Sequence, residues 1–460
     1  MAESSLSLLT AIDALLEKKR YPALRDILIS MNAVDLAALF NEVEDKALPF
    51  LFRLLPKELA AETFVEMDSD AQELLIRSFS DTELKDVVDE LYVDDAVDLI
   101  EEMPANVVRR ILRQADPDTR KVINELLKYP EDSAGSIMTT EFVTLRPKMT
   151  VEDAIKRIRR TGFDKETVNN CYITDDERHL LGAISLRTII LADEDALISD
   201  LMAHNVISAN TLEDQETVAQ TLAKYDLTAL PVTDTENRLV GIVTIDDAMD
   251  VLQEEVTEDI SKMAAVTPSD KPYLKTGTFE IWKNRVPWLL LLMVSATFTG
   301  MIITRFETAL ATHAVLTAFI PMLMDTGGNS GSQASVTVIR ALSLGEVQFR
   351  ELPRVIWKEF RVALLCGLSL ALVGFAKIML VDKLMMGNQS ITIAVTLIVC
   401  ATLAVTVLVA KLVGCSLPIL AKLVGFDPAV MASPFITTIV DALALLIYFR
   451  FTSVLFVSGL

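Results

Sequence analysis

The sequence is poor in the side chains that most enzymes and zinc proteins use for chemistry. Its 460 residues include four cysteines and three histidines. The cysteines have neither a paired nor a metal-type spacing, which indicates packing residues and no disulfide framework. His179, His204 and His313 are scattered, and no nucleophile–base pair or phosphate-binding glycine loop accompanies them. The composition therefore does not point to an enzyme.

Basic residues are outnumbered by acidic ones, and the imbalance is confined to one part of the chain. Residues 288–460 hold only 8 of the 64 acidic residues and 11 of the 42 basic ones, so the net charge is −25 before this point and +3 after it. Nucleic acid is not expected as a partner, because a phosphate backbone requires a basic surface. Cations are the natural partners of the acidic part.

Long apolar runs are concentrated at the end of the chain, and the N-terminus lacks the charge order of a cleaved signal peptide. A membrane-spanning helix needs about 20 mostly apolar residues. Basic residues follow the second apolar segment, and Lys411 and Lys422 follow the fourth, which indicates cytoplasmic loops. The acidic half is then cytoplasmic, in a multi-pass protein of the cell (inner) membrane. The five predicted segments are residues 286–304, 308–340, 362–381, 384–410 and 428–449.

The fifth segment carries an acidic residue at membrane depth. An ionised carboxylate is costly there and normally faces a bundle interior or a water-filled pathway. Ser433, Thr437 and Asp441 are spaced four residues apart, so they share one face of a helix. This face is predicted to line a pore. The alternative is that Asp441 is protonated or paired with a buried basic group such as Lys377.

The second segment contains the polar stretch "PMLMDTGGNSGSQASV" at residues 321–336. Its three glycines let backbones approach closely or interrupt the helix. Asn329 and Gln333 add neutral dipoles that can hold the water shell of an ion. Close helix packing would explain the glycines but not these two amides, so an ion pathway is favoured here too. The role of Asp325 stays open.

Two stretches in the middle of the chain repeat each other. "SIMTTEFVTLRPKMTVEDAI" aligns with "DLMAHNVISANTLEDQETVA" at an offset of 64 residues, and "YITDDERHLLGAIS" with "PVTDTENRLVGIVT" at an offset of 59. Each copy predicts a strand, an amphipathic helix and two further strands. This resembles a tandem pair of CBS domains, at residues 133–196 and 197–253. The resemblance implies a small ligand such as an adenine nucleotide, with ATP a candidate and Thr244 and Asp247 in the ribose-contacting pattern.

Helices are predicted on both sides of this pair. In residues 1–130, "NAVDLAALF" recurs as "DAVDLIEEM", which indicates the stacked hairpins of a helical solenoid. A connecting helix is expected at residues 247–280. Acidic residues line one face of this connecting helix. A second acidic face is predicted in the N-terminal domain, around Asp94 and Asp98. Such rows are usually solvated surface, and like charges weaken a helix, but bridging Mg²⁺ or Ca²⁺ would relieve the repulsion.

In this order, the parts resemble the MgtE family of magnesium channels over nearly all of the chain. The motifs that carry the resemblance are "TGGNSGSQ" in the second membrane segment and "TTIVD" in the fifth. The resemblance implies a homodimer in which Asp441 lies in the pore and Asn329 lies beside the ion path. Ser433 stands where some relatives are expected to have asparagine, which leaves the ion selectivity open.

The resemblance also implies a plug. Cytosolic Mg²⁺ would hold the connecting helix so that it closes the pore, and loss of Mg²⁺ would let the clustered carboxylates repel each other and release it. The residues that match the family's regulatory ligands are Asp94, Asp98, Asp226, Asp247, Asp250, Glu255, Glu258 and Asp259, with Asp427 at the start of the fifth segment.

The sequence thus predicts a multidomain membrane protein, with an α-helical solenoid N-domain, an α/β CBS pair, an acidic connecting (plug) helix and a five-helix transmembrane domain at residues 284–460. The predicted function is a Mg²⁺-selective channel or transporter for magnesium uptake, gated by cytosolic Mg²⁺. One alternative is a secondary exchanger of divalent cations such as Mg²⁺ or Co²⁺. Another is a membrane-anchored CBS nucleotide sensor, which is disfavoured because an anchor does not require Asp441 or the glycine-rich motif.

Overall fold

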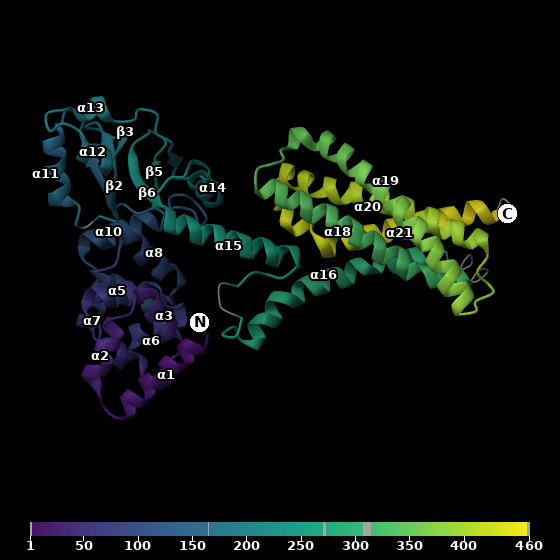
Figure 1. The fold of residues 1–460 in the computed structure, drawn as a ribbon, viewed down its shortest axis with the longest axis horizontal. Coiled ribbons are helices and arrows are strands. Elements are labelled where there is room, and N and C mark those ends of the chain that lie inside the picture. The colour runs from purple at the N-terminus through teal and green to yellow at the C-terminus, as the bar shows by residue number, and fades with distance from the viewer. Residues whose placement is uncertain (1, 164, 270–272, 307–313, 458–460) are drawn as a thin grey trace. The chain divides into compact units, whose positions relative to one another are not determined.

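The structure is a computed structural model that describes residues 2–163, 165–269, 273–306 and 314–457. It divides into two compact units, Met1–Leu252 and Gln253–Leu460 (Figure 1). Each unit has hydrophobic cores of its own.

The first unit begins with short helices that pack in alternation. Contacts join α3 to α5, α5 to α7 and α8 to α10. Their core includes Phe40, Phe52, Phe64 and Phe79, and the ring centroids of Phe52 and Phe79 lie 5.4 Å apart. The ten helices are α1 (Ala2–Glu17), α2 (Tyr21–Ile29), α3 (Ala33–Glu42), α4 (Leu48–Phe52), α5 (Lys57–Val65), α6 (Ser69–Ser78), α7 (Asp81–Val88), α8 (Val93–Glu102), α9 (Ala105–Gln114) and α10 (Pro117–Leu126).

The predicted repeat forms two small sheets of three strands. In each sheet the first pair of strands is parallel and the second pair is antiparallel. The first repeat contains β1 (Phe142–Leu145), α11 (Val151–Thr161), β2 (Thr167–Thr174), β3 (Leu180–Ser185) and α12 (Leu186–Leu191). The second contains α13 (Ile198–Leu201), β4 (Ala209–Asn210), α14 (Gln215–Tyr225), β5 (Ala229–Thr233), β6 (Leu239–Thr244) and the start of α15 (Ile245–Met263).

The two repeats share their local signals as well as their topology. Thr150 caps α11 by accepting a hydrogen bond from the backbone N–H of Asp153, and Asp214 caps α14 by accepting one from Thr217. These helices are offset by 64 residues, the same offset that relates the sequences. The alignment therefore predicted the element order correctly, and the structure adds that the caps recur at the same offset.

The second unit is helical. Its central helix α20 packs against α18, α19 and α21 and contains buried residues along its whole length. The elements are α16 (Thr278–Arg305), the 3₁₀ turn η1 (Ala314–Phe319), α18 (Ile320–Ser343), η2 (Phe349–Glu351), α19 (Leu352–Lys377), the π-helical stretch η3 (Ile378–Met385), α20 (Ile393–Val424), η4 (Pro428–Met431) and α21 (Ser433–Val457).

Among the described residues, four helical stretches are long and apolar enough to cross a membrane. Helix α18, which corresponds to the predicted second crossing, is not one of them, because its polar residues lower its hydropathy. The beginning of that predicted crossing, residues 308–313, lies outside the described residues. The four stretches are Thr278–Arg305, Phe349–Met385, Ile393–Val424 and Pro428–Ser453.

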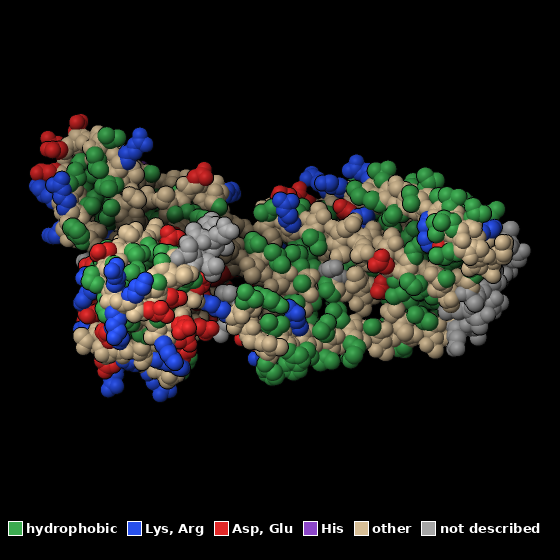
Figure 2. Space-filling view, turned by 60° about the horizontal axis from the view of Figure 1, so that its bottom comes forward, with side chains coloured by type: hydrophobic (Ala, Val, Ile, Leu, Met, Phe, Trp, Pro, Cys, Tyr) green, Lys and Arg blue, Asp and Glu red, His purple; other side chains and the backbone are tan. Residues whose placement is uncertain are grey.

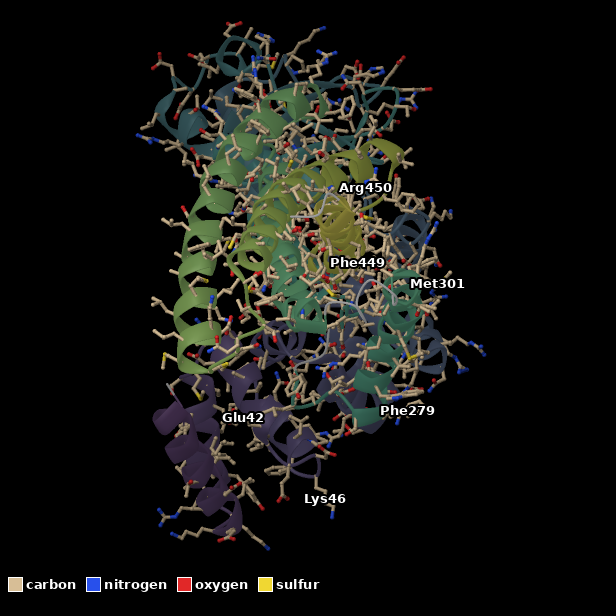
Figure 3. The ribbon with its side chains drawn as sticks, turned by 90° about the vertical axis from the view of Figure 1, so that its right-hand side faces the viewer. Glu42, Lys46, Phe279, Met301, Phe449 and Arg450 are labelled. Carbon is tan, nitrogen blue, oxygen red and sulfur yellow. The ribbon has the colours of Figure 1, made fainter. Side chains whose placement is uncertain are left out.

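The lipid-facing character of the second unit is clearest on α16. This helix has no buried residue, and Phe279 and Met301 are 75% and 64% exposed (Figure 3). On α21, by contrast, Phe449 is buried while its neighbour Arg450 is exposed (Figure 3). Apolar side chains cover much of the surface of this unit (Figure 2). Burial in lipid explains why so many of them face outward.

Some predicted helix ends were wrong. The fourth segment was expected at residues 384–410, but α20 begins at Ile393, where Thr392 caps it by accepting from the N–H of Val395, and it continues to Val424. Lys411 therefore lies inside a helix and is only 5% exposed, so it does not mark a loop. The connecting helix was expected at residues 247–280, but α15 ends at Met263.

Candidate cation sites

Carboxylates from four parts of the first unit converge on one place. We call this group, whose charges raise one another's pKa values, the first acidic cluster. Carboxylate oxygens of Asp94, Glu141 and Glu166 all lie within 4.8 Å of one another. The members of the cluster are Asp94, Asp95, Asp98, Glu141, Glu166, Asp246 and Asp247.

The parallel pairing of β1 and β2 brings two of these acids together. Glu141 directly precedes β1 and Glu166 directly precedes β2, and the backbone N–H of Glu166 donates to the carbonyl oxygen of Glu141 at 2.9 Å. Glu141 also accepts a hydrogen bond from the N–H of Val93 at 3.3 Å, which fixes it against the first turn of α8. Asp94 follows Val93 directly.

Two carboxylate oxygens in this cluster are buried without a donor among the described residues. They are Oδ1 of Asp94, a residue that is 6% exposed, and Oε2 of Glu166. Burial and the charge of Asp247 raise the pKa of Asp94 well above its ordinary value. Burial and neighbouring aspartates raise the pKa values of Glu166 and Asp95 to about 7. Unpaired buried charge is costly, and a group of oxygen ligands suits a hard divalent cation.

Three of the predicted regulatory ligands, Asp94, Asp98 and Asp247, meet in this cluster. Burial raises the pKa of Asp98 to about 7 and that of Asp247 to about 6, in each case with a contribution from other aspartates. Asp250 lies one turn along α15, and burial and Asp246 raise its pKa. Asp226 is exposed, ends α14 with a φ of 52°, and has no recorded bond to the cluster among the described residues.

The sequence prediction missed Glu141 and Glu166. Neither belongs to an acidic run, so charge patterning does not reveal them. A usable signal does exist, because each precedes a predicted strand and the starts of parallel strands meet at one edge of a sheet.

The second unit holds another acidic group, which we call the second acidic cluster: Glu258, Asp259 and Asp427. The ammonium of Lys262 lies 2.6 Å from a carboxylate oxygen of Glu258 and 2.6 Å from one of Asp427. The hydroxyl of Ser343 donates to Asp259 at 3.1 Å. The end of α15 is thereby tied to the end of α18 and to η4. Glu255, one turn earlier on α15, is half-buried.

A lysine therefore occupies the place where the sequence predicted a metal contact between Asp427 and the connecting helix. Burial lowers the pKa of Lys262, but its hydrogen bonds to Asp427 and Glu258 outweigh this effect and leave the pKa raised. Burial raises the pKa of Asp259. The second acidic cluster is partly neutralised by the chain itself, whereas in the first the Oδ1 of Asp94 and the Oε2 of Glu166 have no partner among the described residues.

The glycines of the polar stretch bring α18 against two neighbouring helices. A Cβ atom on Gly327 would lie 2.7 Å from a methyl carbon of Thr406, and one on Gly331 would lie 2.9 Å from Ile436. A Cβ atom on Gly414 of α20 would overlap the backbone carbonyl of Gly331. Close helix packing therefore explains the glycines of this stretch. It does not explain Asn329 and Gln333.

The other side of α18 is polar and uncovered. Asp325, Asn329 and Gln333 are exposed at intervals of four residues, and the amide of Asn329 donates to Asp325 at 3.1 Å. We call these three residues the polar row. Isolated acidic side chains are visible among the apolar surface of this unit (Figure 2). A polar surface of this kind on a membrane helix requires water or a partner.

Helix α21 brings its own polar residues toward this row. Asp441 is half-buried and close enough to Asp325 for the two carboxylates to interact. Thr437 packs on Gly328, and its hydroxyl donates to the carbonyl oxygen of Pro434 at 2.9 Å. The Ser433 side chain lies outside the described part of the structure. No ion pair between Asp441 and Lys377 is recorded among the described residues, and Lys377 pairs with Asp382 at 2.8 Å.

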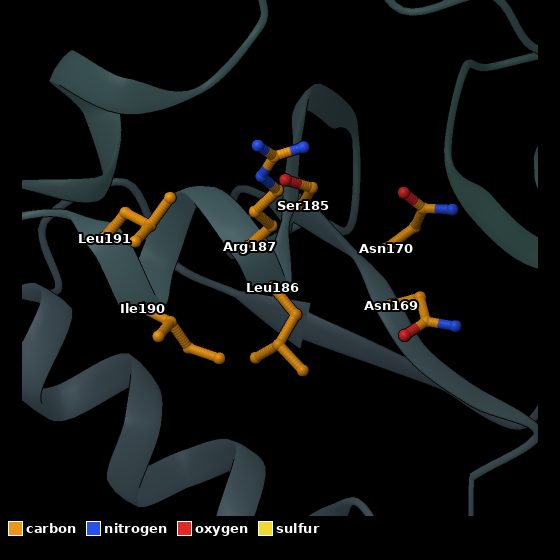
Figure 4. A pocket seen from close by; sticks show the side chains of 7 residues that line it. All are labelled: Asn169, Asn170, Ser185, Leu186, Arg187, Ile190 and Leu191. Carbon is orange, nitrogen blue, oxygen red and sulfur yellow. The ribbon is translucent and has the colours of Figure 1, made fainter.

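A cavity of about 710 Å³ opens in the first CBS unit. Asn169 and Asn170 come from β2, and the remaining residues come from the end of β3 and from α12 (Figure 4). In the repeat alignment, its Ser185 corresponds to Thr244 of the second repeat. Thr244 itself is buried, and its hydroxyl donates to Asp247. The lining residues are Asn169, Asn170, Ser185, Leu186, Arg187, Ile190 and Leu191.

One polypeptide thus joins an acidic helical region, two repeated α/β units and a bundle of apolar helices with a polar row. These features define a multidomain membrane protein whose sites suit hard cations. The model of the MgtE family, described as a divalent cation transporter, matches residues 320–451. The model of the MgtE intracellular N domain matches residues 31–132, and CBS domain models match residues 134–195 and 198–254.

Full-length relatives agree with these matches. The magnesium transporter MgtE of Thermus thermophilus is 37% identical over 430 residues, which cover 93% of each chain. The magnesium transporter MgtE of Bacillus subtilis is 31% identical over 446 residues, 96% of each chain. The chain belongs to the MgtE family, as its two membrane motifs predicted.

Solved structures match the N-terminal part. One, described as the cytosolic domain of the Mg²⁺ channel MgtE in complex with ATP, is 36% identical with a TM-score of 0.51, and the match covers 53% of this chain and 99% of that one. Another, described as the soluble part of a magnesium transporter, is 32% identical with a TM-score of 0.50 over 55% of this chain and 99% of that one.

Proposed function

We propose that the protein is a Mg²⁺-selective channel or transporter for magnesium uptake, closed by cytosolic Mg²⁺ bound at its acidic clusters. The observation that carries the proposal is the polar row Asp325–Asn329–Gln333 beside Asp441 in an otherwise apolar unit. Amide and carboxylate oxygens can hold the water shell that Mg²⁺ gives up reluctantly. The names of the full-length relatives, magnesium transporters, support the choice of ion.

The polar row also supports a homodimer. In one chain it is exposed, although α18 is expected to lie in the membrane as the second of five crossings. A second copy related by a twofold axis would cover the row and place two Asp441 carboxylates around one path. The N-terminal half then lies in the cytoplasm of a cell (inner) membrane protein, which agrees with the match to a family model described as intracellular.

Gating rests on the two acidic clusters. Mg²⁺ bound by Asp94, Glu141 and Glu166, with Asp98, Asp247 and Asp250 near it, would offset their repulsion and hold α8 against the start of α15. At the other end of α15, Asp259 and Lys262 tie the helix to α18 and η4. Glu255, Glu258 and Asp427 would bind a second ion when Lys262 is displaced. Asp226 remains a proposed ligand.

An adenine nucleotide is proposed for the cavity around Arg187 and not for Thr244 and Asp247. Asp247 belongs to the first acidic cluster, where a phosphate-bearing ligand would be repelled. The cavity offers a guanidinium, two asparagines and apolar side chains. The ATP complex of the solved cytosolic domain supports the ligand class. Arg187→Ala is expected to weaken ATP binding in a calorimetric titration.

The test is Mg²⁺ flux into liposomes that contain the full-length protein. Asp441→Asn removes the acidic group at the path and is expected to reduce flux by two orders of magnitude or more, on the order of what a lost charge interaction costs. Thr396→Val, a buried substitution of similar shape on α20 away from the polar row, serves as the control. Flux that survives Asp441→Asn would refute the pathway, and flux that requires a counter-ion gradient would identify an exchanger.

A further inference from the structure

A second cavity, at the first CBS repeat, is lined by basic residues. The compact unit that contains it, Met1–Leu252, is strongly acidic as a whole. The cavity has a volume of about 380 Å³ and lies between β1, α11, the turn from β2 to β3, and the start of β6. Three threonines, Thr144, Thr161 and Thr174, also line it. The four basic residues in its wall are Arg146, Arg157, Lys165 and Arg178.

The positive charges of this cavity are not neutralised by the groups that they contact. Arg146 donates to the carbonyl oxygen of Thr174 at 2.9 Å and also to that of Asp175. Arg178 donates to the carbonyl oxygen of Leu239 at 3.1 Å. No carboxylate within 4 Å of any of the four basic side chains is recorded among the described residues. These neutral acceptors fix the guanidinium groups but leave their charge in place.

The nearest acidic turn does not supply the missing negative charge. The carboxylate of Asp175 accepts from Nδ1 of His179 at 2.8 Å and from the backbone N–H groups of Glu177 and His179. It is therefore engaged within its own turn. Several like charges around one half-buried cavity repel each other, and an anion that binds between them relieves the repulsion.

Comparison of the two repeats shows that the fold does not require these charges. With the offsets of 64 and 59 residues, Arg146, Arg157 and Arg178 correspond to Asn210, Thr221 and Asn237. The second repeat forms the same sheet and the same helix with neutral residues at these three positions. The cationic cavity is thus a property of the first repeat alone, not of the CBS fold.

We propose that this cavity binds a small phosphate-bearing anion. Guanidinium groups match phosphate oxygens with paired donors, and the hydroxyls of Thr144 and Thr174, which accept from Arg157 and Arg146, add neutral ones. Phe142, Val143 and Leu239 supply an apolar wall for a small organic part of the ligand. The site is separate from the Arg187 cavity, with which it shares no lining residue.

The test is isothermal titration of the full-length protein in detergent with inorganic pyrophosphate, in EDTA so that no divalent ion competes. Arg157→Thr introduces the residue of the second repeat, and Lys165→Gln removes a charge from a side chain for which no bond to a described residue is recorded. The matched control is Arg160→Thr, which removes the same charge from an exposed position of α11 outside the cavity. We expect saturable binding that weakens about tenfold or more in both cavity variants, equivalent to about 1.4 kcal/mol, and is unchanged in the control.

A second titration with ADP in an Arg187→Ala background identifies the source of the phosphate. Tighter binding of ADP than of pyrophosphate would mean that the cavity takes a nucleotide, and equal binding would mean that it reads the phosphoryl groups alone. Each result supports the site if Arg157→Thr and Lys165→Gln weaken the measured binding of the probe. The proposal is overturned if wild type binds neither probe saturably, or if Arg160→Thr weakens binding as much as the cavity variants do.

Discussion

Asp94 has a buried carboxyl group, and its Oδ1 has no hydrogen-bond donor in the described structure. Buried groups of this kind normally have a hydrogen-bond partner or a counter-ion. The two closest candidate co-ligands of Asp94, Glu141 and Glu166, are also acidic. The arrangement lowers the stability of the metal-free chain, and it would give a bound cation three carboxylates at once. In the proposed function, a single side chain thus links the stability of the first unit to metal binding.

Asp94→Asn is expected to raise the melting temperature of the full-length protein in EDTA and to reduce the further rise that Mg²⁺ produces. The substitution replaces a buried carboxyl group, whose ionisation burial opposes, by a neutral amide, which stabilises the metal-free state by about 1–3 kcal/mol, and it deletes a potential anionic ligand. Thermal unfolding in detergent with and without Mg²⁺ measures both effects. Asp26→Asn, an exposed position on α2, should change neither. An undiminished Mg²⁺ effect in Asp94→Asn would exclude Asp94 as a ligand.

At the scale of the elements, α18 and α20 meet backbone to backbone at Gly331 and Gly414. Any side chain at position 414 would force the two helices apart. Gly414→Ala is therefore expected to destabilise the protein by about 1–3 kcal/mol, as overpacking does, which chemical or thermal denaturation in detergent would measure.

A second glycine provides the matched control for this substitution. A Cβ atom on Gly300 of α16 meets nothing within 4 Å, so Gly300→Ala is expected to be neutral or to stabilise the helix by up to about 1 kcal/mol. If both substitutions had the same effect, the cost at Gly414 could not be assigned to close packing.

The end of α15 depends on Lys262, which bridges Glu258 and Asp427. A bound Mg²⁺ must displace this ammonium, so Lys262→Gln is expected to lower the Mg²⁺ concentration that half-closes the pathway, by about tenfold. Flux into liposomes at stepped Mg²⁺ measures the midpoint. Lys262→Arg keeps the charge and should stay close to wild type. A midpoint that does not move in Lys262→Gln would show that no ion binds between these carboxylates.

For the whole molecule, the raised pKa values predict a dependence of stability on pH. Glu166 and Asp95, with pKa values of about 7, hold more protons when folded than when unfolded, where carboxyl groups titrate at about pH 4. Stability in EDTA should therefore fall as the pH rises from about 4 to 7. Mg²⁺ competes with these protons, so its stabilising effect should be larger at about pH 8 than at about pH 5. Melting temperatures at both values, with and without Mg²⁺, test this, and equal Mg²⁺ effects would contradict it.

The sequence predicted most of the elements but placed their ends less well. Two repeat offsets were enough for the two sheets, because strand, helix and hairpin signals recur in both copies. In the membrane part, hydropathy locates apolar runs but does not detect a cap such as Thr392, so α20 was displaced. A lysine inside a helix, Lys411, was taken for a loop residue for the same reason.

The candidate sites were predicted where acids recur along one helix and missed where folding brings single acids together. Asp94, Asp98 and Asp247 belong to visible acidic faces. Glu141 and Glu166 are isolated in the sequence, and only the register of two parallel strands makes them neighbours. The bridging role of Lys262 is likewise a tertiary property, because Asp427 is 165 positions away along the chain.

The polar row on α18 also has a consequence for the life of the protein in the cell. In the proposed homodimer, a newly made chain that has met no second copy keeps Asp325, Asn329 and Gln333 uncovered, and polar side chains left in lipid are costly. Under this proposal, the lifetime of each chain depends on how many others the membrane contains. Halving synthesis would lower the steady-state amount of protein by more than half.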